Sequence, residues 1–325
     1  MDYRQKIDYS SLSTYMDCPR KFLFQYILHF RSSKQSIHLV FGSCWHYGLE
    51  CVYNVLKDDP DIVTVDFATN LSIKSFNKLW QIEGAHRFPD EDIIFPKSPG
   101  HAANMYYQYW KQYLKIDQEE KKVLAVESPF TINLSGTIPG LPDYIGRLDL
   151  IHRLANGNVE ITDHKTAKSL WPTSLTSFEM SFQTDGYLTA GHIYYDSVPS
   201  MIYNIALCQK SKIAFHRFYI NKRKAQIEQF INDLLYYCQL ITHDLSLFDQ
   251  DLIEFKKWTD NINCFRRCPG YACTLFMSNC PYVRICKLKS NPLLWHNKPP
   301  GGYSINEWNP ETHEAKIKKQ LEELS

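Results

Sequence analysis

Two short segments of the chain combine acidic and basic residues in a pattern that suits hydrolysis of a phosphodiester. The first is Gly146-Arg147-Leu148-Asp149, and the second is Asp163-His164-Lys165-Thr166. Both lie in stretches that alternate like strands, so Asp163 and Lys165 would project from the same face. If Asp149 lies across from them, two carboxylates and an ammonium group converge. A solvated hairpin with a cross-strand ion pair is the simpler alternative.

These groups are chemically sufficient to cut a phosphodiester. Two carboxylates can hold a divalent ion, and Mg²⁺ keeps water molecules in its remaining positions. Such an ion polarises a phosphoryl oxygen and lowers the pKa of a bound water. The lysine can orient that water or stabilise the developing negative charge.

The register of the hairpin decides whether the two carboxylates can meet. Asn156-Gly157 is a strong hairpin signal. A two-residue loop at this dipeptide would place the side chains of Asp149 and Asp163 on opposite faces of the sheet. We therefore predict a three-residue loop, made of 155–157 or of 156–158, or a β-bulge near the site. The carboxylates of Asp149 and Asp163 would then be near enough to share one ion.

Other residues of suitable type are scattered along the chain, and each has a simpler structural interpretation when taken alone. His46 follows Trp45 on a predicted apolar helix and could be a core histidine. Glu127 is a carboxylate on a predicted apolar strand. Gln183 and Tyr187 are four residues apart on a predicted helix, so they share one face.

The order of these motifs is more specific than any one of them. The chain contains G-x-x-x-H, E, G-x-x-D, D-x-K-T and Q-x-x-x-Y in that order, after an opening segment Ser11–Phe22 that ends in Cys-Pro-Arg-Lys-Phe. This order resembles the RecB/AddB-type branch of the PD-(D/E)XK nucleases, from about Ser10 to Cys286. The resemblance implies a restriction-endonuclease-like core that hydrolyses DNA.

The resemblance also implies roles for individual residues. The metal ligands would be His46, Asp149, Asp163 and the backbone carbonyl of His164. The catalytic lysine would be Lys165, and the residues that orient the site and touch DNA would be Gln183 and Tyr187. Glu127 matches a recurring acidic position whose role is less uniform, and we include it among the catalytic candidates. Because imidazole is a softer ligand than Mg²⁺ prefers, we expect Mn²⁺ to support activity as well.

Ten cysteines are present, and five of them fall in one short segment. These five are Cys264, Cys268, Cys273, Cys280 and Cys286. In a reducing compartment, clustered thiols indicate a metal site or an iron–sulfur cluster before disulfides.

The family resemblance implies a [4Fe–4S] cluster held by Cys18, Cys273, Cys280 and Cys286. The gap between Cys273 and Cys280 departs from the commoner C-x2-C spacing, which leaves Cys268 as a rival for Cys273 and Cys264 as a weaker one. Zinc on the same thiolates is the alternative, and a zinc knuckle within 264–286 would not need Cys18. Because Cys18 stands where the family places its first ligand, we expect the cluster.

The surrounding pattern indicates a mixed α/β (α+β) protein. Helical spacing fills most of residues 1–120, which we expect to form an N-terminal helical lobe contributing His46 and Cys18. Residues 121–250 alternate like strands with helical stretches between them, as expected of a nuclease core with a small mixed sheet flanked by helices. Residues 251–325 would form the iron–sulfur clasp and a charged C-terminal helix.

Composition limits the class of protein. Lys and Arg total 36 against 35 Asp and Glu, which excludes a histone-like basic protein but allows a local basic cleft. No apolar run is long enough for a membrane span, and the first residues lack the apolar core of a signal peptide. We expect an intracellular protein of the cytoplasm or nucleoid, encoded by a cell or a phage, without a membrane partner.

These observations predict a metal-dependent DNA exonuclease that processes single-stranded or duplex ends during recombination, repair or replication. No Walker-type phosphate loop is present, so a helicase or a strand-annealing protein would act as a separate partner. The alternative is a non-catalytic nucleic-acid-binding protein with a structural or redox iron–sulfur or zinc site. A zinc-finger-like interaction protein is a third alternative, which the N-terminal Cys-Pro motif disfavours.

Overall fold

The structure, a computed structural model, describes most of the chain. The described residues are 2–32, 36–195, 200–254, 262–274, 279–288, 292–295, 298–307 and 310–323. The chain divides into two compact units, each built from segments that are distant in sequence. Unit 1 contains Met1–Gln35, Thr131–Ile145 and Glu228–His313, and unit 2 contains Ser36–Phe130, Gly146–Ile227 and Glu314–Ser325. The functional division at residues 120 and 250 stays a prediction.

Unit 2 is organised around a mixed sheet. Its strands are β3 (Lys121–Ile132), β4 (Asp143–Leu154), β5 (Val159–Ala167), β6 (Ser200–Cys208) and β7 (Ile213–Ile220). β4 pairs with β3 and runs antiparallel to β5, β5 runs parallel to β6, and β6 runs antiparallel to β7. All residues of β6 after the first are buried, as expected of an apolar strand covered on both faces.

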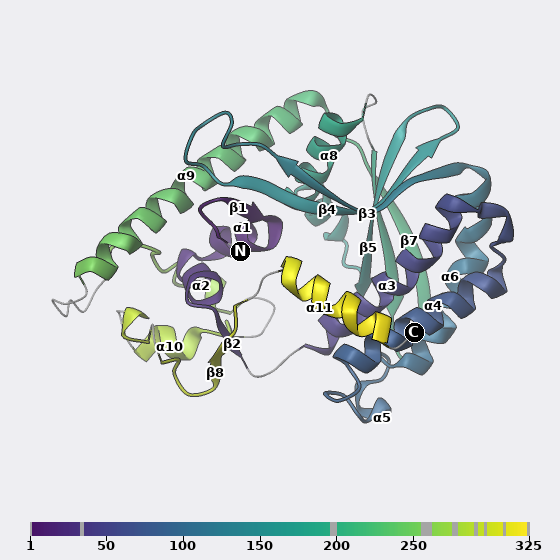
Figure 1. Ribbon diagram of the computed structural model, residues 1–325, viewed down its shortest axis with the longest axis horizontal. Coiled ribbons are helices and arrows are strands. Elements are labelled where there is room, and N and C mark those ends of the chain that lie inside the picture. The colour runs from purple at the N-terminus through teal and green to yellow at the C-terminus, as the bar shows by residue number, and fades with distance from the viewer. Residues whose placement is uncertain are drawn as a thin grey trace. The chain divides into compact units, whose positions relative to one another are not determined.

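Three long helices cover one face of this sheet. They are α3 (Ile37–Asp58), α4 (Val65–Glu83) and α6 (Pro99–Glu119), and they pack side by side (Figure 1). Ser36, Thr64 and Ser98 cap them by accepting hydrogen bonds from backbone N–H groups of the first turn. Their apolar stripes meet in one buried core, in which Trp45 stacks on Tyr106 with ring centroids 4.3 Å apart.

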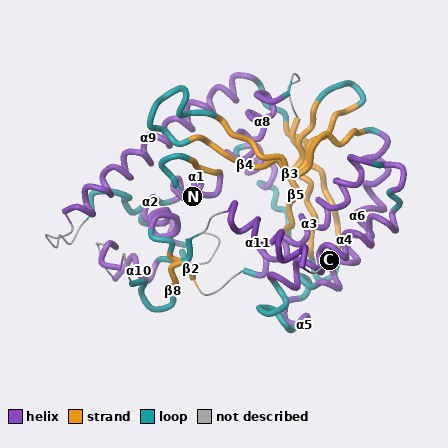
Figure 2. Tube along the Cα trace, viewed as in Figure 1, coloured by secondary structure: helices purple, strands orange, loops and turns teal. Residues whose placement is uncertain are grey.

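The opposite face of the sheet carries α7 (Ser174–Glu179) and α8 (Phe182–Tyr194). Neighbouring residues of β5 point to opposite faces of the sheet. On one face, the His164 ring stacks on Tyr53 of α3 with centroids 5.6 Å apart. The neighbouring Asp163 accepts a hydrogen bond from Gln183 of α8 at 3.2 Å. The strands therefore lie between helices (Figure 2), and the predicted fold class, a mixed sheet flanked by helices, is confirmed.

Unit 1 joins the N-terminal helices to the cysteine-rich segment. Its elements are β1 (Lys6–Asp8), α1 (Tyr9–Asp17), α2 (Pro19–Phe22), a π-helix (Leu23–Ile27), β2 (Phe30–Ser32), a 3-10 turn (Tyr271–Cys273), α10 (Val283–Leu288) and β8 (Tyr303–Ile305). β1 pairs with the first residues of β4, and β2 pairs with β8. Arg20 is buried and donates from Nε to the carbonyl oxygen of Phe265 at 2.8 Å, while Phe22 stacks on the Phe265 ring.

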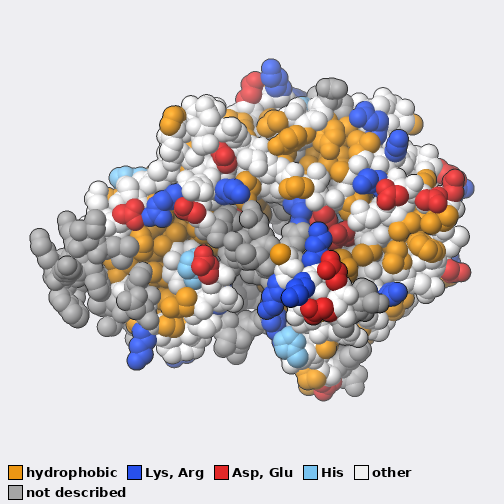
Figure 3. Space-filling model, viewed as in Figure 1, with side chains coloured by type: hydrophobic (Ala, Val, Ile, Leu, Met, Phe, Trp, Pro, Cys, Tyr) orange, Lys and Arg blue, Asp and Glu red, His pale blue; other side chains and the backbone are white. Residues whose placement is uncertain are grey.

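The remaining described elements connect or follow these. They are the 3-10 turns Pro60–Ile62 and Pro292–Trp295 and the helices α5 (Glu91–Ile94), α9 (Lys224–Glu254) and α11 (Pro310–Glu323). On the face that Figure 3 displays, basic and acidic side chains are interspersed, in keeping with the net charge of +1. Within the described residues, no helix is long and apolar enough to cross a membrane.

The hairpin between β4 and β5 has one of the two registers that the sequence allowed. Leu150 pairs with Thr162 and Arg153 pairs with Val159. Leu154 donates its backbone N–H to the carbonyl oxygen of Asn158 at 2.8 Å, so the loop consists of 155–157. Gly157 adopts a positive φ of 86° there, which glycine tolerates without strain. The predicted three-residue loop is confirmed.

We expect His152 on β4 to make the fold sensitive to acid. This histidine is 1% exposed, and burial lowers its pKa to about 3. His152 takes up a proton near pH 6.5 in the unfolded chain but stays neutral in the folded chain at that pH. Its contribution to stability is therefore complete above pH 6.5 and is lost as the pH falls toward 3. Between pH 7 and pH 5 the free energy of unfolding should fall by about 2 kcal/mol less in His152→Phe than in the wild-type protein. Urea unfolding at both pH values measures this, and an unchanged pH dependence would contradict it.

Candidate active site

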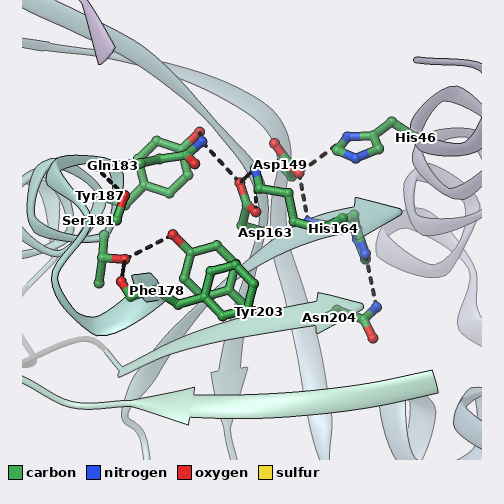
Figure 4. Close-up of polar contacts among 12 residues, drawn as sticks. His46, Asp149, Asp163, His164, Phe178, Ser181, Gln183, Tyr187, Tyr203 and Asn204 are labelled. Atoms are coloured by element: carbon green, nitrogen blue, oxygen red, sulfur yellow. Dashed lines mark hydrogen bonds and ion pairs between the residues drawn. The ribbon is translucent and has the colours of Figure 1, made fainter. Parts of the chain in front are cut away.

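The β4–β5 hairpin brings the central acidic residues together (Figure 4). The backbone N–H of His164 donates to Asp149 Oδ2 at 2.9 Å, which fixes that carboxylate against β5. His46 reaches the same oxygen from α3, with Nδ1 3.4 Å away. The backbone of His164 also hydrogen-bonds the His46 imidazole. Three residues from three elements thus converge around one carboxylate.

His46, Glu127 and Asp149 form a group that fits a divalent cation. Their nearest ligand atoms all lie within 4.8 Å of one another. Two carboxylates and one imidazole are a donor set suited to Mg²⁺ or Mn²⁺. Burial lowers the pKa of His46 to about 4, so its ring is neutral at pH 7 and can act as a ligand.

Glu127 reaches this group through an unusual backbone conformation. Its φ is +48°, a left-handed value that costs a non-glycine residue of order 1 kcal/mol within a strand. Its carboxylate also binds Arg147, with Oε2 2.7 Å from Nε. The family resemblance made Glu127 a catalytic candidate, but the sequence carries no signal for the local backbone conformation that directs this side chain toward His46 and Asp149.

Asp163 lies beside this group but bonds to other partners. Lys165 Nζ lies 2.9 Å from Asp163 Oδ1 and 2.7 Å from Oδ2, and Gln183 Nε2 donates to Oδ1 at 3.2 Å. Gln183 Nε2 lies also 3.0 Å from Tyr187 Oη, so the two α8 residues share a face as predicted. Among the described residues, the close metal-binding group does not include Asp163. One ion shared by Asp149 and Asp163 therefore stays a prediction.

The buried charges of the site shift one another's protonation. Burial raises the pKa of Asp163 to about 6, although Lys165 opposes this effect. Burial also raises the pKa of Asp149. Burial alone would lower the pKa of Lys165, but Asp163 and Asp149 outweigh it and raise that pKa, which keeps the lysine cationic. The site thus holds a fixed positive charge beside carboxylates that gain from binding a cation.

Behind the site, a buried polar network supports His164, and sequence reasoning missed it. Asn204 Nδ2 lies 2.9 Å from His164 Nδ1 and donates to Tyr109 Oη at 2.6 Å. Tyr109 and Tyr53 join through their hydroxyl groups, which are 2.8 Å apart. Tyr53 then donates to Asp117 at 2.8 Å. A polar residue inside the otherwise apolar β6 was the available signal for Asn204.

The network ends in an ion pair between α6 and β7. Arg217 donates to both carboxylate oxygens of Asp117 at 2.7 Å, and its guanidinium lies 3.8 Å from the centroid of the Tyr113 ring. The side chain of Asp117 is fully buried and that of Arg217 is 8% exposed. Bidentate pairing of this kind compensates the cost of burying both charges and fixes their geometry.

Several cysteines of unit 1 lie close enough to interact through hydrogen bonds or electrostatically. The backbone N–H of Cys268 lies 3.5 Å from Cys18 Sγ, and that of Cys280 donates to the carbonyl oxygen of Cys273 at 2.8 Å. Burial raises the pKa of the Cys280 and Cys286 thiols, and Cys18 and Cys273 add to this effect. Cys264 is fully buried.

Comparison with known proteins identifies the family. A crystal structure from Eubacterium rectale, described as a candidate exonuclease, matches with 13% identity and a TM-score of 0.38 over 70% of this chain and 77% of that chain. The structure of SSO0001 matches with 17% identity and a TM-score of 0.25 over 48% and 69% of the two chains. No curated protein sequence matches. The model of the PD-(D/E)XK nuclease superfamily matches residues 7–287, and the chain therefore belongs to this superfamily.

Proposed function

We propose that this superfamily member is a metal-dependent deoxyribonuclease of the RecB/AddB type that removes nucleotides from DNA ends. The observation that carries the proposal is the convergence of His46, Glu127 and Asp149 within 4.8 Å, beside the Asp163–Lys165 pair. The family supplies the substrate class, a nucleic acid, and the group of His46, Glu127 and Asp149 supplies the site for a divalent ion. End processing in recombination, repair or replication, with a helicase or annealing partner, is the role that we assign.

Each residue of the site has a defined task in this proposal. A bound divalent ion would supply Lewis acidity toward a phosphoryl oxygen and make water more acidic. Asp149 and Glu127 provide anionic oxygen ligands, and neutral His46 adds a nitrogen. Lys165 presents a cation where negative charge develops on the phosphoryl group. Gln183 holds the Asp163 carboxylate in place from α8 and, with Tyr187, faces the DNA strand.

The decisive experiment uses linear and circular DNA of both strand types. End-labelled linear DNA should be shortened from an end in Mg²⁺ or Mn²⁺ and left intact in EDTA, while closed circles should resist. Cutting of closed circles at the same rate would replace the exonuclease assignment by an endonuclease. Absence of cleavage under every metal condition, with DNA binding retained, would favour the non-catalytic alternative.

We infer further that unit 1 carries the [4Fe–4S] cluster on Cys18, Cys273, Cys280 and Cys286. Supporting this, Cys280 and Cys286 each interact electrostatically with both Cys18 and Cys273. Burial raises the pKa of both thiols, but Lys21 opposes this effect at Cys280 and Arg20 and Arg267 oppose it at Cys286, so cations lie near thiols that would carry negative charge as ligands.

Protein purified without air is expected to be brown and to contain about four irons per chain. Cys18→Ser should lose the iron and lower the melting temperature, because unit 1 loses its link between distant segments. Cys51→Ser in α3 is the matched control and should retain the iron. Stoichiometric zinc without iron, or iron retained in Cys18→Ser, would contradict the cluster.

The rival positions 268 and 273 are separated by the same assay. Cys273→Ser is expected to lose the iron, because Cys273 acts on both Cys280 and Cys286. Cys268→Ser should retain it, since Cys268 is the exposed residue of the two, although it also interacts with Cys18 and Cys273. The reverse result would assign the ligand to Cys268.

A further inference from the structure

Lys97 is a buried cation with no ion pair to a carboxylate among the side chains that the structure describes, which leave out those of residues 91 and 92. It stands between α5 and α6 and is only 5% exposed. Its Nζ lies 4.8 Å above the ring of Phe41, against the first turns of α3. The acidic group that acts on it is the thiol of Cys208, which burial keeps protonated by raising its pKa to about 11. A buried ammonium with such surroundings is unfavourable unless an anion joins it.

Two further basic side chains, those of His38 and Lys168, lie near Lys97. His38 lies in the first turn of α3 and is exposed. Burial lowers its pKa, and Lys97 and Lys168 lower it further, so three basic groups lie within electrostatic reach and no described carboxylate acts on His38. The amino end of α3, a helix of 22 residues, adds the positive end of its dipole. Lys97, Lys168 and this end of the helix have the sign that attracts an anion, and the neutral ring of His38 can donate an N–H to it.

The fold anchors this basic group at the carboxyl ends of two parallel strands. Cys208, the last residue of β6, donates from Sγ to the carbonyl oxygen of Pro96 at 3.2 Å, next to Lys97. Gln209 Nε2 donates to the carbonyl oxygen of Lys168, which follows β5, at 2.7 Å. Crevices at the carboxyl ends of parallel strands are common ligand sites in α/β proteins.

Helix α3 and strand β5 connect this basic group to the active site. His38, Gly42 and His46 follow one face of α3 at intervals of four residues, so His38 lies roughly 12 Å from His46 along the helix axis. A Cβ atom on Gly42 would lie 3.6 Å from Thr166 Oγ1, the residue after Lys165 on β5. α3 and β5 thus run beside each other from the His46–Asp149 contact to the basic group.

We propose that Lys97, Lys168, His38 and the amino end of α3 bind a backbone phosphate of the nucleic-acid strand, a few nucleotides from the bond that is cut. The proposal rests on the proposed function for its substrate, and on the buried Lys97 for its location. A diester phosphate fits because it brings the single negative charge that the buried ammonium lacks in the described part of the chain. The site would hold the strand in register while the proposed active site cuts it.

Binding without cleavage tests this directly. Anisotropy of a labelled single-stranded oligonucleotide is measured in EDTA at several salt concentrations for the wild-type protein, Lys97→Met, Lys168→Gln and the double variant. Removing both lysines should lower the magnitude of the slope of log K against log salt by about 0.7, the value for one phosphate, and each single substitution should lower it by part of that amount. Lys115→Gln is the control, because this α6 lysine is 82% exposed and pairs with Glu119. Equal slopes in the double variant and the wild-type protein would overturn the proposal.

Thermal denaturation distinguishes a ligand site from a structural lysine. Lys97→Met should not lower the melting temperature, because it removes a buried charge that no described carboxylate balances. Lys121→Met should lower it, since Lys121 pairs with Glu160 and both side chains are at most 5% exposed. A loss in Lys97→Met as large as in Lys121→Met would overturn the proposal.

Two further comparisons distinguish failure of the phosphate site from failure of the proposed function. If inorganic phosphate raises the melting temperature of the wild-type protein alone, while oligonucleotide binding does not depend on Lys97, the site binds free phosphate and the strand assignment is wrong. If the oligonucleotide binds through Lys97 but no metal supports cleavage, the proposed function fails and this inference stands. If DNA is cleaved but its binding depends on neither lysine, the proposed function stands and this inference fails.

Discussion

Replacing Lys165 by Met is expected to reduce DNA cleavage by roughly two to three orders of magnitude. The ammonium of Lys165 is held on Asp163, 2.7 Å from Oδ2, and the aspartate is 1% exposed. Met keeps the length of the side chain but removes the charge that would face the phosphoryl group in the transition state. The rate should therefore fall without a matching loss in DNA affinity, measured as single-turnover cleavage and as binding in EDTA.

Asp163→Asn tests the Asp163–Lys165 pair by changing the aspartate instead of the lysine. It should lose cleavage to a similar degree, because the lysine loses the carboxylate that orients it. Lys115→Met on α6 serves as the control for the loss of a lysine and should cleave at the wild-type rate. Full cleavage by either Lys165→Met or Asp163→Asn, with correct folding shown by circular dichroism, would rule out the assigned site.

The hairpin illustrates how far the sequence could predict the site. Alternation along the two strands and the Asn156-Gly157 dipeptide located the hairpin, and the need for Asp149 and Asp163 to meet excluded the two-residue loop. Two three-residue loops and a β-bulge remained, because strand period alone cannot choose among them. The structure selects 155–157, which ends with Gly157 in its left-handed conformation.

Other parts of the site depend on contacts that have no local sequence pattern. Glu127 enters the metal-binding group through one left-handed residue inside β3. Asn204 looks like an isolated polar residue in an apolar strand and Asp117 like one of several polar residues at the end of a helix, and their partners are about 40 and 100 residues away. Periodicity predicts which face a residue takes, but it does not predict which distant residue it meets. The same limit concealed Lys97.

Replacing Arg217 by Met is expected to lower the free energy of unfolding by about 3–5 kcal/mol at pH 7. The substitution leaves the Asp117 carboxylate fully buried, with Tyr53 as a neutral donor. Urea unfolding measures the loss. Arg153→Met is the control, because Arg153 donates only to the carbonyl oxygen of Gly157 on the surface and should change stability by less than about 0.5 kcal/mol.

The double variant Arg217→Met, Asp117→Asn shows whether the unpaired charge causes the loss. Burial would raise the pKa of Asp117, but Arg217 holds it below its usual value, so the pair's contribution is present at neutral pH and lost as the pH falls below about 4. Removing both charges should therefore recover most of the stability that Arg217→Met loses. Equal losses in the single and double variants would mean that packing against Tyr113, not charge, makes Arg217 necessary. Cleavage should fall in both variants, because the Arg217–Asp117 pair holds the end of the hydroxyl chain that runs through Asn204 to His164, whose backbone N–H fixes Asp149.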